Sequence, residues 1–222
     1  MNIIITGAGK GIGYELTKYL SENHNIIAIS RDVSQLKKND NLHPFSYDIN
    51  LTEGSNTLFD FIKTKLGHID ILINNAGILI NKSYNQLLSN DIDEMLNTNV
   101  KAPFLLIQKL VPFMKKGSHI VNIGSMGGFQ GSAKFLGLSI YSASKAALAI
   151  LTECLAEELK DIDIQVNCLA LGATQTEMLR SAFPDYTAPL KAFEMARFIA
   201  EFALNGNKYF NGKILPVSIS TP

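Results

Sequence analysis

The sequence predicts an α/β protein built on one doubly wound, mostly parallel sheet of about seven strands, with helices on both faces. Two observations predict this fold. Short β-branched runs alternate with longer segments of helical period from the first residues onward. The short runs are also apolar almost throughout, which is typical of strands buried on both faces of a parallel sheet.

The alternation continues along the whole chain. Strands are expected at 3–5, 26–29, 44–47, 69–73, 119–123, 164–169 and 213–219, and helices near 12–20, 57–66, 92–116, 141–160 and 191–204. Pro103 lies inside the third helix and clashes with the carbonyl of Asn99, so that helix should be distorted there. No repeat, low-complexity tract or linker divides the sequence, and residues 1–222 are expected to form a single domain.

Two of the expected helices are apolar on nearly every side, at 100–114 and 146–155. They offer more hydrophobic surface than one face of a sheet can cover. Because monomers rarely leave large apolar patches in water, a homodimer or homotetramer through the 92–116 and 141–160 helices is expected. Burial beneath the chain's own loops is the alternative.

The composition argues against several classes of partner. Twenty basic and twenty acidic residues give a formal charge of zero, so no general attraction to nucleic acid or to an anionic membrane is expected. A small molecule is the better expectation. The N-terminus carries no basic leader, and no apolar run approaches the length of about 18–20 residues that spans a bilayer. A cytoplasmic location is therefore predicted, and Cys154 and Cys168 are expected to be reduced thiols.

Residues 6–13 form a glycine-rich loop, T-G-A-G-K-G-I-G, between the first expected strand and the first expected helix. Gly7, Gly9, Gly11 and Gly13 would let the backbone turn tightly and approach a pyrophosphate at the N-terminus of that helix. An ATP-binding phosphate loop is excluded, because it needs Gly-Lys-Ser/Thr leading into the helix and here Gly11 follows Lys10. The spacing also differs from the G-x-G-x-x-G dinucleotide fingerprint.

The loop resembles the cofactor loop of the short-chain dehydrogenase/reductase family. Further family motifs follow in the same order, with N-N-A-G at 74–77, a helix asparagine at Asn99, a serine at Ser125 and Y-x-x-x-K at 141–145. The resemblance covers essentially the whole chain. It implies a Rossmann fold and hydride transfer between a nicotinamide cofactor and a carbonyl or secondary alcohol. It further implies cofactor contacts by Ile12, Asp48, Asn75, Ala76, Gly77, Tyr141, Lys145, Gly172, Thr174 and Thr176.

Tyr141 and Lys145 are four residues apart on one face of a helix, so their polar ends can meet at one substrate. A free phenol has a pKa of about 10, but an adjacent ammonium and a cationic oxidised nicotinamide both favour phenolate. Tyr141 could then act as a general acid and base. In isolation such a pair would more often belong to an amphipathic helix with a snorkelling lysine. The catalytic interpretation is favoured here because the glycine loop and Ser125 accompany the pair.

Ser125 ends a predicted strand at the edge where open α/β sheets bind ligands, and its hydroxyl could hydrogen-bond the reacting oxygen. For Asn99 the resemblance implies a backbone-held water that links the lysine to solvent. A hydrolase is disfavoured, because the residues around Ser125 lack the G-x-S-x-G spacing. The histidines and cysteines show no metal-ligand spacing, so no metal is expected.

The cofactor preference is read at the end of the second strand. An NAD enzyme usually carries an acid there, whereas this chain has Ser30 followed by Arg31. Arg31 and Lys10 could clasp a 2′-phosphate, which predicts NADP(H) as the preferred cofactor with NAD(H) possible. Asp32 is one position late and is interpreted as the start of the next helix.

Two differences from the family pattern and one apolar segment near the C-terminal end bear on the nicotinamide contacts and the substrate. Leu171 replaces the proline that the family carries before Gly172, and the 16 positions from Ser125 to Tyr141 slightly exceed the usual family spacing. In the segment that forms a lid in the family, apolar side chains favour a partly apolar substrate, although they could equally pack on their own helix. These are Met178, Leu179, Phe183 and Tyr186.

Two other functions remain open. A 3-oxoacyl-thioester reductase is the main specific alternative within the enzyme class. A non-catalytic NADP(H)-binding regulatory protein also fits the fold, but such a protein would not need the set of Asn99, Ser125, Tyr141 and Lys145.

Overall fold

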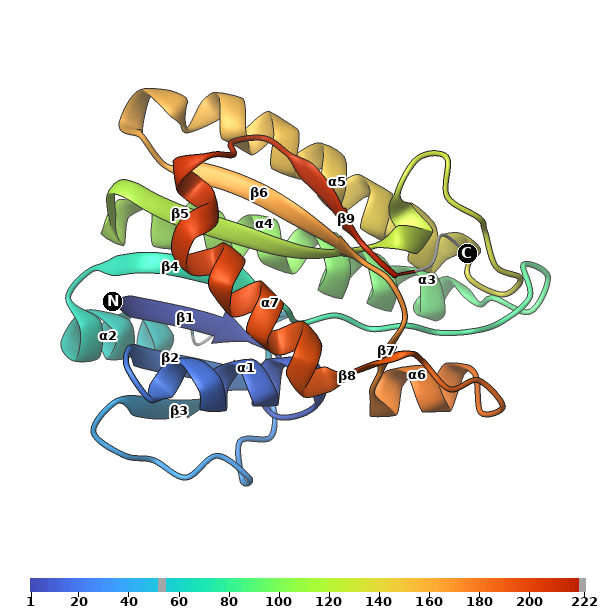
Figure 1. Ribbon diagram of the computed structural model, residues 1–222, viewed down its shortest axis with the longest axis horizontal. Coiled ribbons are helices and arrows are strands. Elements are labelled where there is room, and N and C mark those ends of the chain that lie inside the picture. The colour runs from blue at the N-terminus through green and yellow to red at the C-terminus, as the bar shows by residue number, and fades with distance from the viewer. Residues whose placement is uncertain (52–54, 220–222) are drawn as a thin grey trace.

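A parallel sheet of seven strands forms the centre of the computed structural model, which describes residues 1–51 and 55–219 (Figure 1). The strand order is β3-β2-β1-β4-β5-β6-β9, and every recorded pairing in it is parallel. This confirms the predicted sheet. The strands are β1 Asn2–Thr6, β2 Asn25–Ser30, β3 Leu42–Ser46, β4 Ile69–Asn74, β5 Met114–Ser125, β6 Gln165–Leu171 and β9 Ile214–Val217.

Helices cover both faces of the sheet, as predicted. In Figure 1, α1 (Gly11–Ser21) and α7 (Ala192–Asn205) lie side by side in front of it. On the opposite face lie α2 (Ser55–Leu66), α4 (Ala102–Leu110) and α5 (Ser139–Glu158). The sheet is thus sandwiched between two helical layers, which is the doubly wound arrangement.

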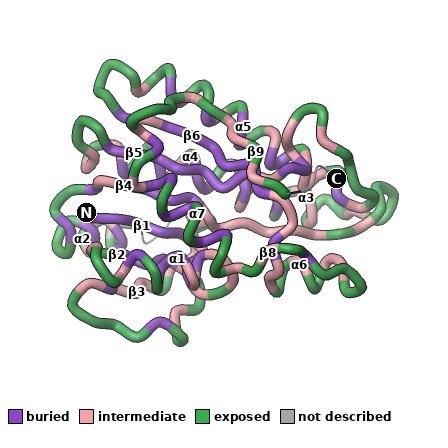
Figure 2. Tube along the Cα trace, viewed as in Figure 1, coloured by how far each residue is buried: buried purple, intermediate pink, exposed green. Residues whose placement is uncertain are grey.

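The strands are continuously apolar because both of their faces are covered. Successive side chains of a strand point to opposite faces. Ile3 and Ile5 pack in the core on the α1–α7 side, whereas Ile4 packs in the core with α2, α4 and α5. All three are fully buried, and the tube of β1 has the colour of buried residues in Figure 2. Burial of such a side chain stabilises the fold by roughly 1.5–3 kcal/mol, so neither face tolerates a polar substitution cheaply.

The order of the strands reverses between β1 and β4. From β1 the chain builds outward through β2 and β3, and from β4 it builds in the other direction through β5, β6 and β9. The loops that leave the carboxyl ends of β1 and β4 therefore diverge, and a crevice opens between them. Open α/β sheets bind ligands at this position.

The predicted helix 92–116 is wrong in its bounds and its continuity. The structure has α3 (Ser89–Leu96), then a five-residue π-helix (Asn97–Lys101), then α4, while 114–116 belong to β5. The distortion that Pro103 predicts is confirmed. Proline has no N–H to donate to the carbonyl of Asn99, and the N–H of Ala102 bonds the carbonyl of Asn97, five residues back.

Smaller differences concern two other helices. The expected helix 141–160 begins two residues earlier, at Ser139, and ends at Glu158. Asp32 does not begin a helix, because the segment 31–41 is irregular. Its carboxylate instead accepts a hydrogen bond of 2.9 Å from the N–H of Ser34, two residues on, and a side chain that competes in this way favours a turn.

One structured segment was not predicted. The short helix α6 (Glu177–Ala182) lies between two short paired strands, β7 (Thr174–Gln175) and β8 (Leu190–Lys191). This pairing brings the two ends of the segment together. Elements of two and six residues leave too short a periodic pattern to be read from sequence. Within the described residues, no helix has the length and apolar character that crossing a membrane requires.

A buried histidine joins the sheet to α7. His119 of β5 is 1% exposed. Its Nδ1 lies 3.0 Å from the carbonyl oxygen of Ala203, and its Nε2 lies 3.0 Å from the side-chain nitrogen of Asn167. The ring therefore donates from Nδ1 and accepts at Nε2, which requires it to be neutral. Burial lowers its pKa to about 4.

Acid is expected to destabilise the fold through His119. Because its pKa falls from 6.5 to about 4 on folding, the unfolded chain binds the proton more readily. The stabilisation is complete above pH 6.5 and falls as the pH drops toward 4, by about 3 kcal/mol at most. Urea unfolding across this interval measures the loss. The variant His119→Gln, which has no titrating ring, should show a shallower fall, and equal slopes would contradict the prediction.

Candidate active site

A cleft of about 950 Å³ opens at the carboxyl edge of the sheet, where the crevice between the β1 and β4 loops lies. It brings together most of the residues that the sequence singled out. The lining includes Gly7, Lys10, Gly11, Ile12, Gly13, Ser30, Arg31, Asp48, Asn75, Ala76, Gly77, Ser125, Tyr141, Lys145, Gly172, Thr174 and Thr176. Two predicted residues do not line it. Gly9 lies behind the loop, against Ser30 and Asp32, and Asn99 is completely buried.

The glycine loop and the loop after β4 are bonded into one floor. The amide of Asn75 donates to the carbonyls of Thr6 (3.0 Å) and Gly7 (3.2 Å), while the Thr6 hydroxyl accepts from the backbone of Asn75 and Ala76 at 3.1 Å each. Gly7 has φ +67°, and a Cβ there would lie 2.7 Å from the Cα of Ala76. A Cβ on Gly13 would lie 2.2 Å from the carbonyl oxygen of Gly7. Side chains at these positions would push the two loops apart, so both glycines are needed for the close packing of this floor.

The part of the cleft near the glycine loop and the end of β2 carries two cations. Lys10 precedes α1, Arg31 follows β2, and both line the cleft, whereas Asp32 does not. Lys10 lies 3.6 Å from the carboxylate of Glu177 at the start of α6, in a pair that is largely exposed. Such a pair contributes little to stability, so the ammonium remains free to meet an anionic ligand.

The backbone at Leu171 is a regular strand. This residue pairs with Ser125 of β5 on one side and with Val217 of β9 on the other. The N–H of Gly172 then donates to the carbonyl of Val217 at 2.9 Å. Leucine in place of the family's proline therefore leaves the lining residues Gly172, Thr174 and Thr176 at the cleft.

Ser125, Tyr141 and Lys145 converge where β5 ends and α5 begins. The side chains of Ser125 and Tyr141 are hydrogen-bonded, and this bond opposes the effect of burial, which raises the pKa of the phenol. The Lys145 ammonium donates to the carbonyl of Ile123 at 2.9 Å and lies 6.0 Å from the centre of the Tyr141 ring. Burial lowers the pKa of Lys145 to about 8. The hydroxyl of Ser125 also accepts from the N–H of Gly127 at 3.1 Å, which leaves its proton free to donate.

Asn99 is held beneath the cleft by its own side chain. Its Oδ1 accepts from the N–H of Ile78, and its Nδ2 donates to the carbonyl of Ile78 and to the hydroxyl of Ser144, all at 2.9 Å. Ser144 donates in turn to the carbonyl of Tyr141 at 2.7 Å. The π-helix is thus bonded to the first turn of α5, next to the phenol.

Sequence reasoning missed the part that Ser144 plays. The available signal was a serine three residues after Tyr141 and inside a helix, where a hydroxyl commonly bonds a backbone carbonyl of the preceding turn. It also missed that Thr6 joins the two loops of the floor. The buried thiol of Cys168 lies under the β5 end, and burial raises its pKa to about 11. Both cysteines are free.

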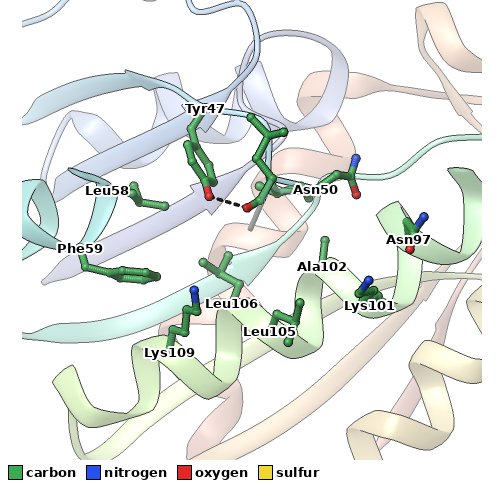
Figure 3. Close-up of a pocket in the computed structure, with 12 residues that line it drawn as sticks. Tyr47, Asn50, Leu58, Phe59, Asn97, Lys101, Ala102, Leu105, Leu106 and Lys109 are labelled. Carbon is green, nitrogen blue, oxygen red and sulfur yellow. Dashed lines mark hydrogen bonds between the residues drawn. The ribbon is translucent and has the colours of Figure 1, made fainter. Parts of the chain in front are cut away.

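A second pocket, of about 120 Å³, lies on the other side of the segment that carries Asp48 (Figure 3). Tyr47, Ile49 and Asn50 line both this pocket and the main cleft, so the segment is a thin wall between them. The Tyr47 hydroxyl donates to the carbonyl of Leu51 at 2.7 Å, and the Asn50 amide donates to Thr98 at 3.0 Å. The wall is thereby bonded to the π-helix that carries Asn99.

Comparison with known proteins gives a consistent result. A family model described as short chain dehydrogenase matches residues 1–187. An uncharacterised oxidoreductase of Thermotoga maritima is 35% identical over 80% of this chain and 73% of its own length. The 3-oxoacyl-(acyl-carrier-protein) reductase FabG of Staphylococcus epidermidis is 28% identical over 97% of this chain and 96% of its own length.

Solved structures share the whole fold. A short-chain dehydrogenase from Burkholderia cenocepacia in complex with NADP is 26% identical, with a TM-score of 0.85 over 97% of this chain and 95% of that chain. A 4-hydroxyisoleucine dehydrogenase complexed with NADH is 25% identical, with a TM-score of 0.86 over 98% of this chain and 96% of that chain. Sequence and fold agree over nearly the full length of both partners. The chain therefore belongs to the short-chain dehydrogenase family and is an oxidoreductase.

Proposed function

We propose that the chain transfers a hydride between a nicotinamide cofactor, preferably NADP(H), and a carbonyl or secondary alcohol, with Tyr141 as the general acid and base. The observation that carries this proposal is the bonded pair of Ser125 and Tyr141 beside the Lys145 ammonium. These three side chains line the same cleft as the glycine loop. A proton donor and a hydride source can therefore meet at one substrate.

The residues present fit a dinucleotide. Gly7, Gly11 and Gly13 line the cleft, and the close packing of Gly7 and Gly13 against the loop after β4 holds the backbone of the glycine loop at its surface. Next to it lies the N-terminus of α1, whose first backbone N–H groups have no partner within the helix and suit a pyrophosphate. A nicotinamide bound in the cleft would supply the hydride in reduction and accept it in oxidation. Similar proteins solved with NADP and with NADH support a nicotinamide cofactor for this chain.

The protein's own groups handle the proton. In reduction the Ser125 hydroxyl orients the carbonyl oxygen, and Tyr141 donates its proton to that oxygen. The raised pKa of the phenol keeps it protonated until then. Lys145 stabilises the phenolate that forms, and Asn99, through Ser144, holds the first turn of α5 in place. In oxidation the same phenolate accepts the proton of the alcohol.

A 3-oxoacyl-thioester reductase is the second candidate. The similarity to the FabG reductase over nearly the full length of both chains favours it. The non-catalytic regulatory alternative is disfavoured, because Ser125, Tyr141 and Lys145 converge with a proton-donor geometry that cofactor binding alone does not require.

Replacing Tyr141 with phenylalanine is expected to lower turnover at least ~100-fold while cofactor affinity is retained, because the ring remains but the transferable proton is lost. NADPH consumption with a panel of carbonyl substrates measures turnover, and fluorescence titration measures cofactor affinity. Tyr209→Phe is the control, since Tyr209 is 77% exposed and does not line the cleft. Unchanged turnover in Tyr141→Phe would refute the assignment.

Removal of the Arg31 guanidinium is expected to weaken NADPH binding about tenfold and to leave NADH binding nearly unchanged, because only NADPH has a 2′-phosphate to pair with it. Titration of both cofactors against Arg31→Ala tests this. Lys37→Ala is the control, because Lys37 is an exposed cation of the same loop but does not line the cleft. This variant should change the affinity for neither cofactor. Equal affinities of the native protein for NADPH and NADH would contradict the proposed preference for NADP(H).

We also propose a homodimer or homotetramer formed through α4 and α5. Apolar side chains remain exposed there, with Ile150 57% and Phe104 37% exposed. A charge at Ile150 would be desolvated by a partner subunit, so Ile150→Asp should reduce the sedimentation mass. Tyr84→Asp, at an 85% exposed residue outside both helices, should leave it unchanged. A native protein that sediments as a monomer would contradict this proposal.

A further inference from the structure

The end of the cleft beyond the catalytic residues is walled by apolar side chains from two segments. Segment 126–138 contributes Phe135 and Leu138 among others, and segment 177–186 contributes Met178, Leu179 and Phe183. Glu177 is the one charged residue that either segment places in the described lining, and it pairs with Lys10 toward the glycine loop. This end of the cleft therefore suits an uncharged group.

Three loops are bonded to one another at the mouth. The rings of Phe135 and Phe183 meet edge to face, with centroids 6.4 Å apart. The amide of Asn81, in the loop after β4, donates to the carbonyl of Ala182 at 2.8 Å. The N–H of the next residue, Lys82, donates to the carbonyl of Gly137 at 3.1 Å. Each loop contacts the other two, so the opening is formed before a substrate arrives.

Segment 126–138 is also braced from within. The hydroxyl of Ser132 donates to the carbonyl of Phe129 at 2.9 Å, and the ammonium of Lys134 donates to the carbonyls of Phe129 (2.8 Å) and Ser132 (3.0 Å). The side chains of Ser132 and Lys134 thus bond to the backbone of their own loop. The next residue, Phe135, lines the cleft, and Leu136 follows it on the exposed surface.

Apolar surface continues from the interior of the cleft onto the outside of the mouth. Phe135, Tyr186 and Met178 line the cleft and are also 45%, 45% and 37% exposed. Leu136, next to Phe135, is 96% exposed. Isolated exposed apolar residues need no explanation, but a set that continues a ligand-binding wall indicates that a ligand covers it.

We propose that the substrate is a carbonyl or alcohol with a long, uncharged alkyl chain, which leaves the cleft along the exposed side of Phe135, beside its contact with Phe183, and lies on Leu136. This inference rests on the proposed function and names its substrate class. Each methylene that the chain adds along this surface leaves water, so kcat/KM should rise about two- to threefold per methylene until the surface is covered.

The test is a series of methyl ketones, 2-butanone, 2-octanone and 2-dodecanone, reduced with NADPH. The native protein should prefer the longest ketone, mainly through a lower KM. In Leu136→Ser the ratio of kcat/KM for 2-dodecanone over 2-butanone should fall at least about fivefold. Ile162→Ser, at a 46% exposed residue of the turn after α5, is the matched control and should keep the native ratio. A flat series, or an unchanged ratio in Leu136→Ser, would overturn the proposal.

A second measurement separates this proposal from the proposed function. Calorimetric titration of 2-dodecanol and 2-butanol onto the protein with NADPH reports binding without turnover. If no ketone is reduced but the long alcohol binds more tightly and Leu136→Ser removes that advantage, the proposed activity fails and the apolar site stands. If both alcohols bind equally, the site is absent. If Leu136→Ser changes the sedimentation mass, this surface joins two copies of the chain and the proposal is wrong.

Discussion

The parallel pairing of β1 with β4 is the constraint on which the rest of the site depends. It places two outgoing loops side by side while the chain builds the sheet in opposite directions from them. Two loops that merely diverge would leave a disordered gap. Here Thr6 and Asn75 bond one loop to the other through both backbone and side chain, so the floor of the cleft is fixed before any ligand binds.

A second set of buried bonds connects the helices to that floor. Pro103 removes the N–H that a regular α-helix would bond to the carbonyl of Asn99, and the π-helix found there presents the Asn99 amide to Ile78 and Ser144. The same distorted turn carries Thr98, which bonds Asn50 in the wall beside Asp48. One local irregularity therefore connects the wall at Asp48, the loop after β4 and the helix of Tyr141.

Sequence predicted those features that depend on short-range patterns or on motifs. The Ile-rich strands, both helical layers and the distortion at Pro103 were readable, because periodicity and proline chemistry are local. The bonds from Asn99 to Ser144 and from Asn81 to Ala182 were not, since each joins segments that only the fold brings together. The failed start of a helix at Asp32 shows the limit of local rules, because its carboxylate made a turn instead. The single-domain organisation and the cytoplasmic location stay predictions.

Burial raises the pKa of Tyr141 and lowers the pKa of Lys145, and in both cases it favours the neutral form of the side chain. Sequence reasoning expected an adjacent ammonium to favour phenolate, but the pKa of the phenol is raised in the structure, because burial outweighs the hydrogen bond with Ser125. Burial therefore disfavours the phenolate, and additional positive charge next to it would favour it. An oxidised nicotinamide carries that charge and a reduced one does not. For the proposed reaction, burial therefore favours the protonated phenol that reduction uses, and the charge of an oxidised nicotinamide would favour the phenolate that oxidation uses.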